Sequence, residues 1–219
     1  MDDRNLGMMA GVPDLESVDR VLSTTRSVRR RLDFGRAVEP EVIERCIDLA
    51  TQAPTGIAAE NWRFIVVTSP EKKLALARLY RDALRALSEA RGGDVKSTQQ
   101  TLADRLHEIP ALILVCGEGA PPSGSLAMQV GYFGSILPAA WSLMLALRAR
   151  GLGATWTSLL TFHSDEVARI LAIPEGVTQT VLLPVGYMKD AVLRPAKRKS
   201  AREVTYWDAW GSTRNEAGD

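Results

Sequence analysis

The segment from Phe133 to Leu147 constrains the fold more than any other part of the chain, because it is apolar on nearly every side that a helix would present. It is shorter than the ~20 residues that a membrane-spanning helix needs, it contains Pro138, and it ends at Arg148. A helix of this kind must be covered by protein on all sides. We therefore expect a buried helix in a soluble protein, and we favour a two-fold dimer interface over a purely intrachain core as its cover.

The patterns around this segment alternate between helical and extended structure. Apolar residues at helical spacing predict the helices, with Ser69 placed to cap one of them and Pro70 to begin it, and short apolar or alternating runs predict the strands. We expect helices over residues 14–24, 40–53, 70–91, 133–150 and 165–171, and strands over residues 64–68, 111–116, 154–160 and 178–187. The polar stretches 92–100 and 117–124 are expected to be loops. This order predicts an α+β fold, an α/β sandwich whose sheet is covered by helices on both faces.

The balance of charge limits the partners that the chain can have. It carries 27 basic and 26 acidic residues, a formal net charge of +1, so no overall field favours nucleic acid or an anionic membrane surface. The clusters Arg26 to Arg31 and Arg194 to Arg202 are basic enough to consider nucleic acid, but neither has aromatic residues interleaved with its charges. We expect no nucleic acid partner and no membrane, and an anionic ligand must be held by local positive charge.

The two cysteines and the first residues are typical of a cytoplasmic protein. Cys46 lies on an apolar helical stripe and Cys116 ends an apolar strand, so both are expected in the core and not in a disulfide or a metal site. The segment from Met1 to Asp14 is acidic and lacks the apolar stretch of a signal peptide. We therefore expect a cytoplasmic location.

The sequence lacks the common motifs for nucleotide, serine-nucleophile and metal chemistry. It has no lysine-containing phosphate loop, no dinucleotide fingerprint and no Gly-x-Ser-x-Gly elbow. Gly151-Leu152-Gly153 follows an expected helix instead of opening one, so we interpret it as a helix stop. His107 and His163 each stand without a nearby second ligand, and we expect surface or capping roles for them and no metal site.

A basic turn, Arg26-Ser27-Val28-Arg29, follows the first expected helix. Two guanidinium groups three residues apart, with a hydroxyl group between them, are donors suited to a phosphate monoester. A phosphate of this kind carries about −1.5 to −2 charges near neutral pH. The spacing alone does not separate such a site from an ordinary solvated basic surface, and both interpretations stay open at this point.

Four segments, taken in order, resemble the nitroreductase family of flavoproteins and together cover nearly the whole chain. They are the basic turn with Arg30; the segment Ala53 to Phe64, which leads into a strand; the segment Ala146 to Leu159; and Pro184-Val185-Gly186-Tyr187, followed by basic residues from Arg194 to Arg198 and an aromatic end at Trp207. Each segment is moderately specific, whereas the ordered set is distinctive.

The resemblance implies FMN as the cofactor and assigns residues to it. The family's basic turn binds FMN, which puts Arg26 and Ser27 at the phosphate and ribityl end. Arg29 would lie beside the ring atoms that become negative on reduction, where a fixed cation stabilises the charge. Arg198, with Lys197, would close over the phosphate from the C-terminal end of the chain.

The same resemblance assigns Trp156, Thr157, Ser158 and Leu159 to a strand end behind the flavin ring. It implies that the backbone N–H of Leu159 points toward the ring nitrogen that accepts hydride, and it assigns no catalytic side chain. Periodicity alone favours an ordinary alternating strand here. The chain has Thr25 where many members have an arginine, which would remove one phosphate contact.

A loop that reaches FMN from the partner subunit is also implied, and here the chain departs from the family pattern. The residues assigned to this loop are Pro54, Thr55, Gly56 and Ala58. The family usually has Asn at the position of Ala58, Gln at Glu60 and Pro at Asn61. Ala58 cannot donate a hydrogen bond to the flavin, and Glu60 places a carboxylate where an amide is usual. These departures favour an alternative role, an FMN-binding protein for storage or sensing.

The resemblance implies an intertwined homodimer with a central, mostly antiparallel sheet and two FMN sites. Electrons would pass from NADH or NADPH through FMN to a nitroaromatic compound, a quinone or a related electron-poor small molecule, by a ping-pong mechanism. Both nicotinamide cofactors stay open, because no nicotinamide fingerprint is present. A second alternative is a specialised flavin reaction, such as reductive dehalogenation or flavin fragmentation.

We expect one FMN-binding domain over residues 14–211, with flexible termini over residues 1–13 and 212–219. Residues 75–108 form an expected helical excursion that would act as a lid over the open face of the flavin. Tyr80, Arg81 and Arg85 are candidates for substrate contact within it, and a solvated helix face is the alternative.

Overall fold

The structure is a computed structural model that describes residues 13–56 and 60–214. The α-helices of this part are α1 (Leu15–Thr24), α2 (Pro40–Ala50), α3 (Pro70–Arg91), α4 (Ser97–Arg105), α5 (Leu126–Ala149), α6 (Ser164–Leu171) and α7 (Ala201–Val204), and the short 3-10 helices are η2 (Leu106–Glu108) and η3 (Leu159–His163). The strands are β1 (Trp62–Val67), β2 (Ala111–Glu118), β3 (Leu152–Ala154) and β4 (Val177–Tyr187). Ala58 and most of the termini predicted to be flexible lie outside the described residues.

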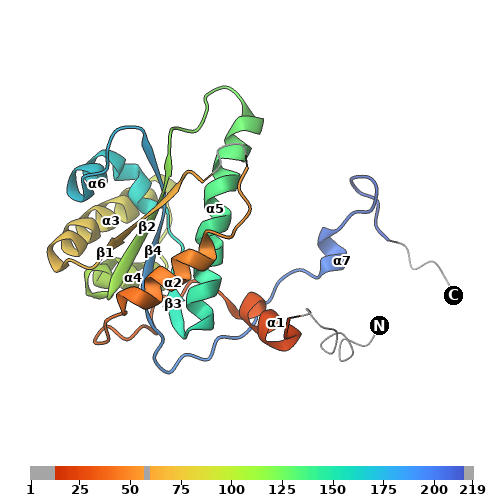
Figure 1. The fold of residues 1–219 in the computed structure, drawn as a ribbon, viewed down its shortest axis with the longest axis horizontal. Helices are drawn as coiled ribbons and strands as arrows, with labels where there is room; N and C mark the ends of the chain where they lie inside the picture. Colours follow the sequence, from red (N-terminus) through yellow and green to blue (C-terminus); the bar gives the residue numbers. More distant parts are fainter. Residues whose placement is uncertain (1–12, 57–59, 215–219) are drawn as a thin grey trace.

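The four strands form one antiparallel sheet in the order β1-β2-β4-β3 (Figure 1). β2 is a central strand and is buried along almost its whole length. Leu112 of β2 stands opposite Val67 of β1 and Pro184 of β4. The continuous apolar run predicted this burial, because a strand covered on both faces needs apolar residues at every position. The predicted antiparallel sheet is confirmed.

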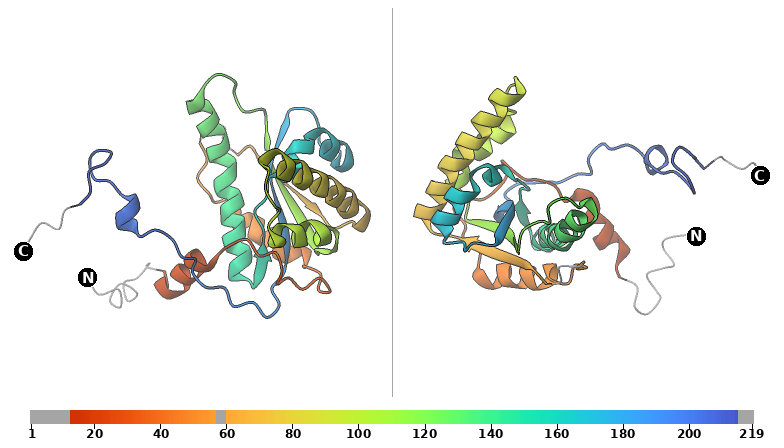
Figure 2. Two further views of the ribbon diagram at one scale, coloured as in Figure 1. Left: turned by 180° about the vertical axis from the view of Figure 1, so that it is seen from behind. Right: turned by 90° about the horizontal axis from the view of Figure 1, so that it is seen from above.

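Alternate residues of β2 face two different helical layers. Leu112 and Leu114 belong to a cluster of buried side chains that includes α3, α4 and α6. Ile113 and Val115 belong to a second cluster, which includes α2 and α5. Figure 2 shows helices on both sides of the sheet in each view. The predicted α+β sandwich is therefore confirmed, since successive side chains of a strand point to opposite faces.

The ends of several helices follow from their capping residues. Asp14 accepts a hydrogen bond from the Ser17 N–H and Ser69 accepts one from the Lys72 N–H, so each caps the helix that follows it. α3 ends at Gly92, whose φ of 59° is a left-handed conformation that glycine adopts without strain. The predicted bounds of α1 and α3 are confirmed.

At Gly117, near the end of β2, α5 packs closely against the sheet. A Cβ atom at this position would lie 2.2 Å from Ile136 Cδ1 and 2.8 Å from Tyr132 Oη. The Tyr132 hydroxyl donates toward the carbonyl oxygens of Gly117, at 3.2 Å, and Gly119, at 2.9 Å. The missing side chain therefore sets the distance between α5 and β2.

We predict that Gly117→Ala lowers the free energy of unfolding by about 1–3 kcal/mol, because overpacking would force α5 away from the sheet. The measurement is denaturant unfolding of the two proteins side by side. Gly93→Ala is the matched control, since the nearest atom to its added Cβ lies 3.9 Å away. Equal stabilities for Gly117→Ala and the parent would contradict the account of this contact.

Residues 92–100 were predicted to be a loop, and this prediction is wrong at its end because α4 begins at Ser97. The helix is anchored by Leu102 and Ala103, which are both buried. Two apolar positions in a helix this short give too weak a period to be detected in the sequence.

The strand predicted for residues 154–160 is also wrong. β3 ends at Ala154, Thr157 makes a single bridge to Leu182, and η3 begins at Leu159. The backbone N–H of Thr161 donates to Ser158 O, which closes a helical turn. Alternation of small polar and larger residues predicted a strand, but the chain leaves the edge of the sheet after a few residues.

α5 begins at Leu126, earlier than predicted, and Ser125 caps it by accepting a hydrogen bond from the Met128 N–H. Glycine and polar residues in its first turns hid this part of the helix in the sequence. By length and composition alone α5 could cross a membrane, but half of its most apolar 18-residue window is buried within the domain. The sheet and the other helices therefore cover only part of this apolar helix.

Candidate functional site

The basic turn after α1 is attached at its start to the end of the helix. The hydroxyl groups of Thr24 and Thr25 donate to the carbonyl oxygens of Arg20 and Val21, at 2.5 and 2.6 Å. The Val21 carbonyl also accepts the Thr25 N–H, at 3.1 Å, so the two hydroxyl groups add side-chain bonds to the last turn of α1. The chain then leaves the helix immediately before Arg26.

The other end of the turn is attached to the end of β3. The Val28 N–H donates to Ala154 O at 2.9 Å, and the Thr155 hydroxyl donates to Val28 O at 2.7 Å. The Trp156 N–H donates to Ser27 Oγ at 3.1 Å. These bonds join two of the four segments that carry the family resemblance, and they fix the backbone from which the turn's arginines extend.

Next to the turn lies a cavity of about 860 Å³. Its lining residues are Leu22, Ser23, Thr25, Arg26, Ser27, Arg29, Trp141, Pro195, Ala196 and Arg198. Arg26, Arg29 and Arg198 bring three guanidinium groups to it, and no carboxylate stands among these lining residues. The convergence of Arg26 and Arg198, implied by the family resemblance, is therefore present in the structure.

The path of the chain after β4 explains how Arg198 reaches the basic turn that contains Arg26. This segment runs along the edge of the body and passes beside α1 before it reaches α7 (Figures 1 and 2). It thereby brings Pro195 and Arg198 against the turn. Lys197 is exposed and is not among the lining residues, although it was predicted to bind with Arg198.

The donors at this cavity suit a phosphate monoester on an organic group. Guanidinium groups form strong paired hydrogen bonds to phosphate oxygens, and a hydroxyl adds a further donor. Trp141, 40% exposed, supplies an apolar wall. Sequence reasoning missed Trp141 as a wall because its place in an apolar run predicted core packing. The residues present fit the phosphate end of FMN.

In the segment after β3, Thr157 and Leu159 are buried and Ser158 is exposed. Tyr80, on α3, has its hydroxyl 3.3 Å from Thr157 Oγ1. Burial raises the pKa of Tyr80, so its hydroxyl stays protonated at neutral pH. The Leu159 N–H, the predicted donor to the flavin, points toward Thr157 Oγ1 at the long distance of 3.5 Å.

The loop with Pro54, Thr55 and Gly56 is exposed and is not part of the lining of this cavity. The Gly56 N–H donates to Ser135 Oγ of α5 at 2.8 Å, so the loop lies against the helix predicted to form a dimer interface. Ala58, the fourth residue assigned to this loop, lies outside the described residues.

The other two departures from the family pattern have different surroundings. Glu60 is exposed, and its carbonyl oxygen accepts a hydrogen bond from Arg63. Asn61 is buried, and its side-chain amide lies 3.4 Å from Glu118 O. Its Oδ1 is buried without a hydrogen-bond partner among the described residues.

The three candidates for substrate contact do not meet at the cavity. Tyr80 is 2% exposed and faces Thr157. Arg81 and Arg85 line a separate hollow of about 320 Å³ between α3 and α4. Arg85 also lies 3.7 Å from Asp82 in an exposed ion pair. A lid role for residues 75–108 stays a prediction.

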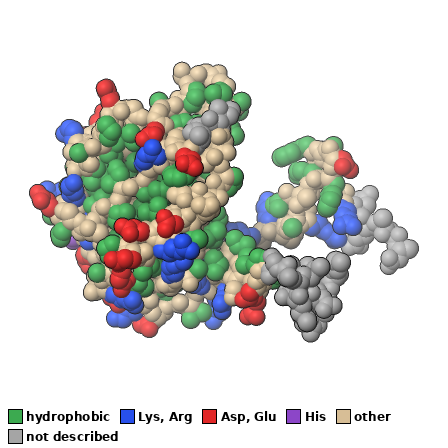
Figure 3. Space-filling view, in the orientation of Figure 1, with side chains coloured by type: hydrophobic (Ala, Val, Ile, Leu, Met, Phe, Trp, Pro, Cys, Tyr) green, Lys and Arg blue, Asp and Glu red, His purple; other side chains and the backbone are tan. Residues whose placement is uncertain are grey.

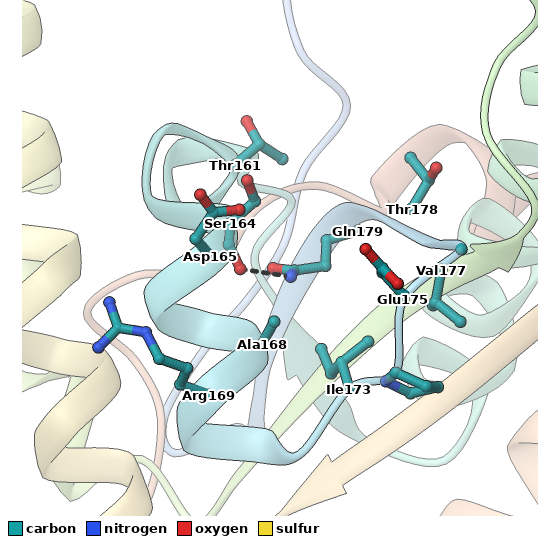
Figure 4. Close-up of a pocket in the computed structure, with 12 residues that line it drawn as sticks. Thr161, Ser164, Asp165, Ala168, Arg169, Ile173, Glu175, Val177, Thr178 and Gln179 are labelled. Carbon is teal, nitrogen blue, oxygen red and sulfur yellow. Dashed lines mark hydrogen bonds between the residues drawn. The ribbon is translucent and has the colours of Figure 1, made fainter.

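A further hollow of about 570 Å³ lies between α6 and the start of β4 and contains none of the predicted site residues (Figure 4). Gln179 donates to Ser164 O at 2.7 Å across it. Asp165, Glu175 and Arg169 give it charges of both signs. This mixture does not select an anionic ligand, so the arginine-lined cavity is the better candidate for a cofactor.

Large apolar side chains remain exposed on the outer side of α5 and on the C-terminal segment. On α5, Leu126 is 77% and Val130 is 62% exposed. On the C-terminal segment, Trp207 and Trp210 are exposed, and the latter stacks with Tyr206 at a centroid distance of 4.9 Å. Figure 3 shows hydrophobic side chains on this segment, away from the body. Surfaces of this kind mark protein interfaces.

Comparison with known proteins gives consistent matches. A model of the nitroreductase family matches residues 22–187. A putative NADH dehydrogenase/NAD(P)H nitroreductase of Methanothermobacter thermautotrophicus is 27% identical over 188 residues, which cover 84% of this chain and 80% of the relative. An iodotyrosine deiodinase of Thermotoga neapolitana is 30% identical over 151 residues, which cover 66% of this chain and 75% of the relative.

Solved structures share the fold. The crystal structure of an oxidized iodotyrosine deiodinase bound to FMN and 3-iodo-L-tyrosine superposes with a TM-score of 0.65 at 24% identity. The superposition covers 85% of this chain and 98% of that chain. At this level of identity the likeness shows the fold alone.

Proposed function

Because this chain belongs to the nitroreductase family, we propose that it is a cytoplasmic, homodimeric, FMN-dependent oxidoreductase. It would pass electrons from NADH or NADPH to an electron-poor acceptor such as a nitroaromatic compound or a quinone. One observation carries the proposal: Arg26 and Arg29 from one end of the chain and Arg198 from the other line a single cavity.

In this proposal the side chains at the cavity bind and orient the cofactor. Arg26 and Arg198 hold the phosphate from two sides, and charge-assisted bonds of this type are among the strongest that side chains form. Ser27 Oγ accepts the Trp156 N–H, which leaves its own proton available to donate to a phosphate oxygen.

Arg29 and the segment after β3 would lie beside the flavin ring of FMN. When bound, FMN supplies hydride acceptance from the nicotinamide and electron release to the acceptor in two separate half-reactions. Arg29, which also lines the cavity, would supply a fixed positive charge that stabilises the reduced cofactor. The Thr157 hydroxyl, held by Tyr80, lies beside the Leu159 N–H and orients the backbone there.

A homodimer would cover apolar surfaces that are exposed in a single chain. The exposed apolar residues of α5 need cover, and a two-fold axis would place a second α5 against them. The loop with Gly56 contacts the same helix at the buried Ser135. Leu126 and Val130 are therefore placed in the proposed interface.

The activity is tested by rapid mixing in two steps. We predict that anaerobic NADH or NADPH bleaches the flavin absorbance, and that a nitroaromatic compound or a quinone then restores it. The rate with each nicotinamide decides which reductant the protein uses. A flavin that stays oxidised with both reductants would contradict the proposal and would favour the storage or sensing role.

Similarity to an iodotyrosine deiodinase supports a second candidate, the reductive removal of halogen from an aromatic ring. In such a reaction a carbon–halogen bond is replaced by a carbon–hydrogen bond and halide leaves, with two electrons from the reduced cofactor and one proton from the cofactor or from water. Anaerobic incubation of the dithionite-reduced protein with 3-iodotyrosine separates the two candidates. Release of iodide in proportion to flavin would support dehalogenation, and nitro reduction without iodide release would exclude it.

A further inference from the structure

We propose that Arg148 is a positioning residue for the phosphate end of the cavity and that it acts through Thr24. The inference rests on the proposed FMN site, and it concerns a residue to which neither the motifs nor the family resemblance assigned a role. Arg148 lies in the last turn of α5, whereas Thr24 ends α1, two residues before Arg26.

α1 needs an anchor because it lies at the edge of the molecule. Figure 1 shows it to the right of the body, beside the lower end of α5. Val18 and Leu22 on this helix are exposed, although they are apolar. The helix packs against α5, so the position of the following turn depends on how these two helices are joined.

Arg148 links α5 to α1 through a hydrogen bond. Its Nη2 donates to Thr24 Oγ1 at 3.2 Å, and Thr24 is only 6% exposed. Within residues 13–56 and 60–214, Arg148 Nε is buried without a hydrogen-bond partner. The partly buried guanidinium is thus held in place through Thr24, and a hydrogen bond to a charged donor contributes more than a neutral one.

Thr24 connects Arg148 to the last turn of α1, which leads into the basic turn. Its hydroxyl accepts from Arg148 and donates to Arg20 O, so one oxygen atom links α5 to the last turn of α1. Ser27 and Val28 are independently fixed to the end of β3. Arg26 therefore lies between two fixed points, Thr24 before it and Ser27 after it. Removal of Arg148 would free Thr24 from α5.

The test compares FMN with riboflavin, which lacks the phosphate, by fluorescence titration of the flavin-free full-length protein. We predict that Arg148→Ala raises the dissociation constant for FMN about 10-fold, the effect of losing one charge-assisted hydrogen bond, and changes that for riboflavin less than about 2-fold. Thr24→Val should reproduce this loss, and the double variant should add little to it. Arg148→Lys should recover most of the FMN affinity.

Arg150→Ala is the matched control, because Arg150 is on the same end of α5 but donates to Ala146 O within its own helix. Equal weakening of FMN and riboflavin by Arg148→Ala would indicate general loosening and overturn the inference. Additive losses from Arg148→Ala and Thr24→Val, or no loss from either, would overturn it too. A parent protein that binds neither flavin would remove the proposed function and this inference with it.

Discussion

Replacement of Arg26 and Arg198 together by alanine is expected to leave a folded protein that no longer retains FMN. Each charge-assisted hydrogen bond to phosphate contributes about 1.5–3 kcal/mol. Every 1.4 kcal/mol is about tenfold in affinity, so the double variant should bind FMN roughly 10²–10⁴ times more weakly. The measurement is the flavin released from protein purified under identical conditions, followed by titration with FMN.

Lys197→Ala provides the control for this experiment. Lys197 adjoins Arg198 but does not line the cavity, so its removal should change FMN affinity little. In their flavin-free forms both variants should keep the unfolding temperature of the flavin-free parent, because Arg26 and Arg198 are exposed. A double variant that keeps its flavin, or a Lys197→Ala protein that loses it, would refute the assignment of the phosphate site.

A charge on the outer side of α5 is expected to separate the subunits. Val130→Arg would place two unpaired guanidinium groups near a two-fold axis in an apolar interface. Breaking the interface in this way costs about 3–5 kcal/mol or more, which raises the dimer dissociation constant roughly 10²–10⁴-fold. Sedimentation velocity over a range of concentrations measures the change, and flavin content should fall with dimer content.

The matched control is Leu74→Arg, at an exposed leucine on α3, which packs on the opposite face of the sheet. This variant should remain dimeric. If the parent sediments as a monomer, or if Val130→Arg stays dimeric, the outer side of α5 is not the interface.

The sequence predicted the parts of the fold that depend on local physics. The continuous apolar run predicted that β2 is a buried strand, and Ser69 with Pro70 predicted the start of α3. It failed where tertiary structure decides between local alternatives. At Thr157 the pattern fits a strand, but the chain leaves the sheet edge and turns into η3.

The site was predictable in part. Arg26, Ser27 and Arg29 form a local motif whose spacing suits a phosphate, but only the family resemblance favoured a phosphate site over a solvated basic surface. The approach of Arg198 depends on the path of the chain after β4, which no spacing encodes, and only the family resemblance implied it. The hydrogen bond between Arg148 and Thr24 joins two helices that are distant in sequence, so the sequence of neither helix predicts it.

The central claim is that guanidinium groups from both ends of the chain hold one phosphate, and a crystal structure of the protein with FMN tests it most directly. We predict that phosphate oxygens lie about 3 Å from nitrogen atoms of Arg26 and of Arg198, within hydrogen-bond range. A phosphate turned toward solvent, or a flavin bound in the hollow beside α6, would contradict the claim.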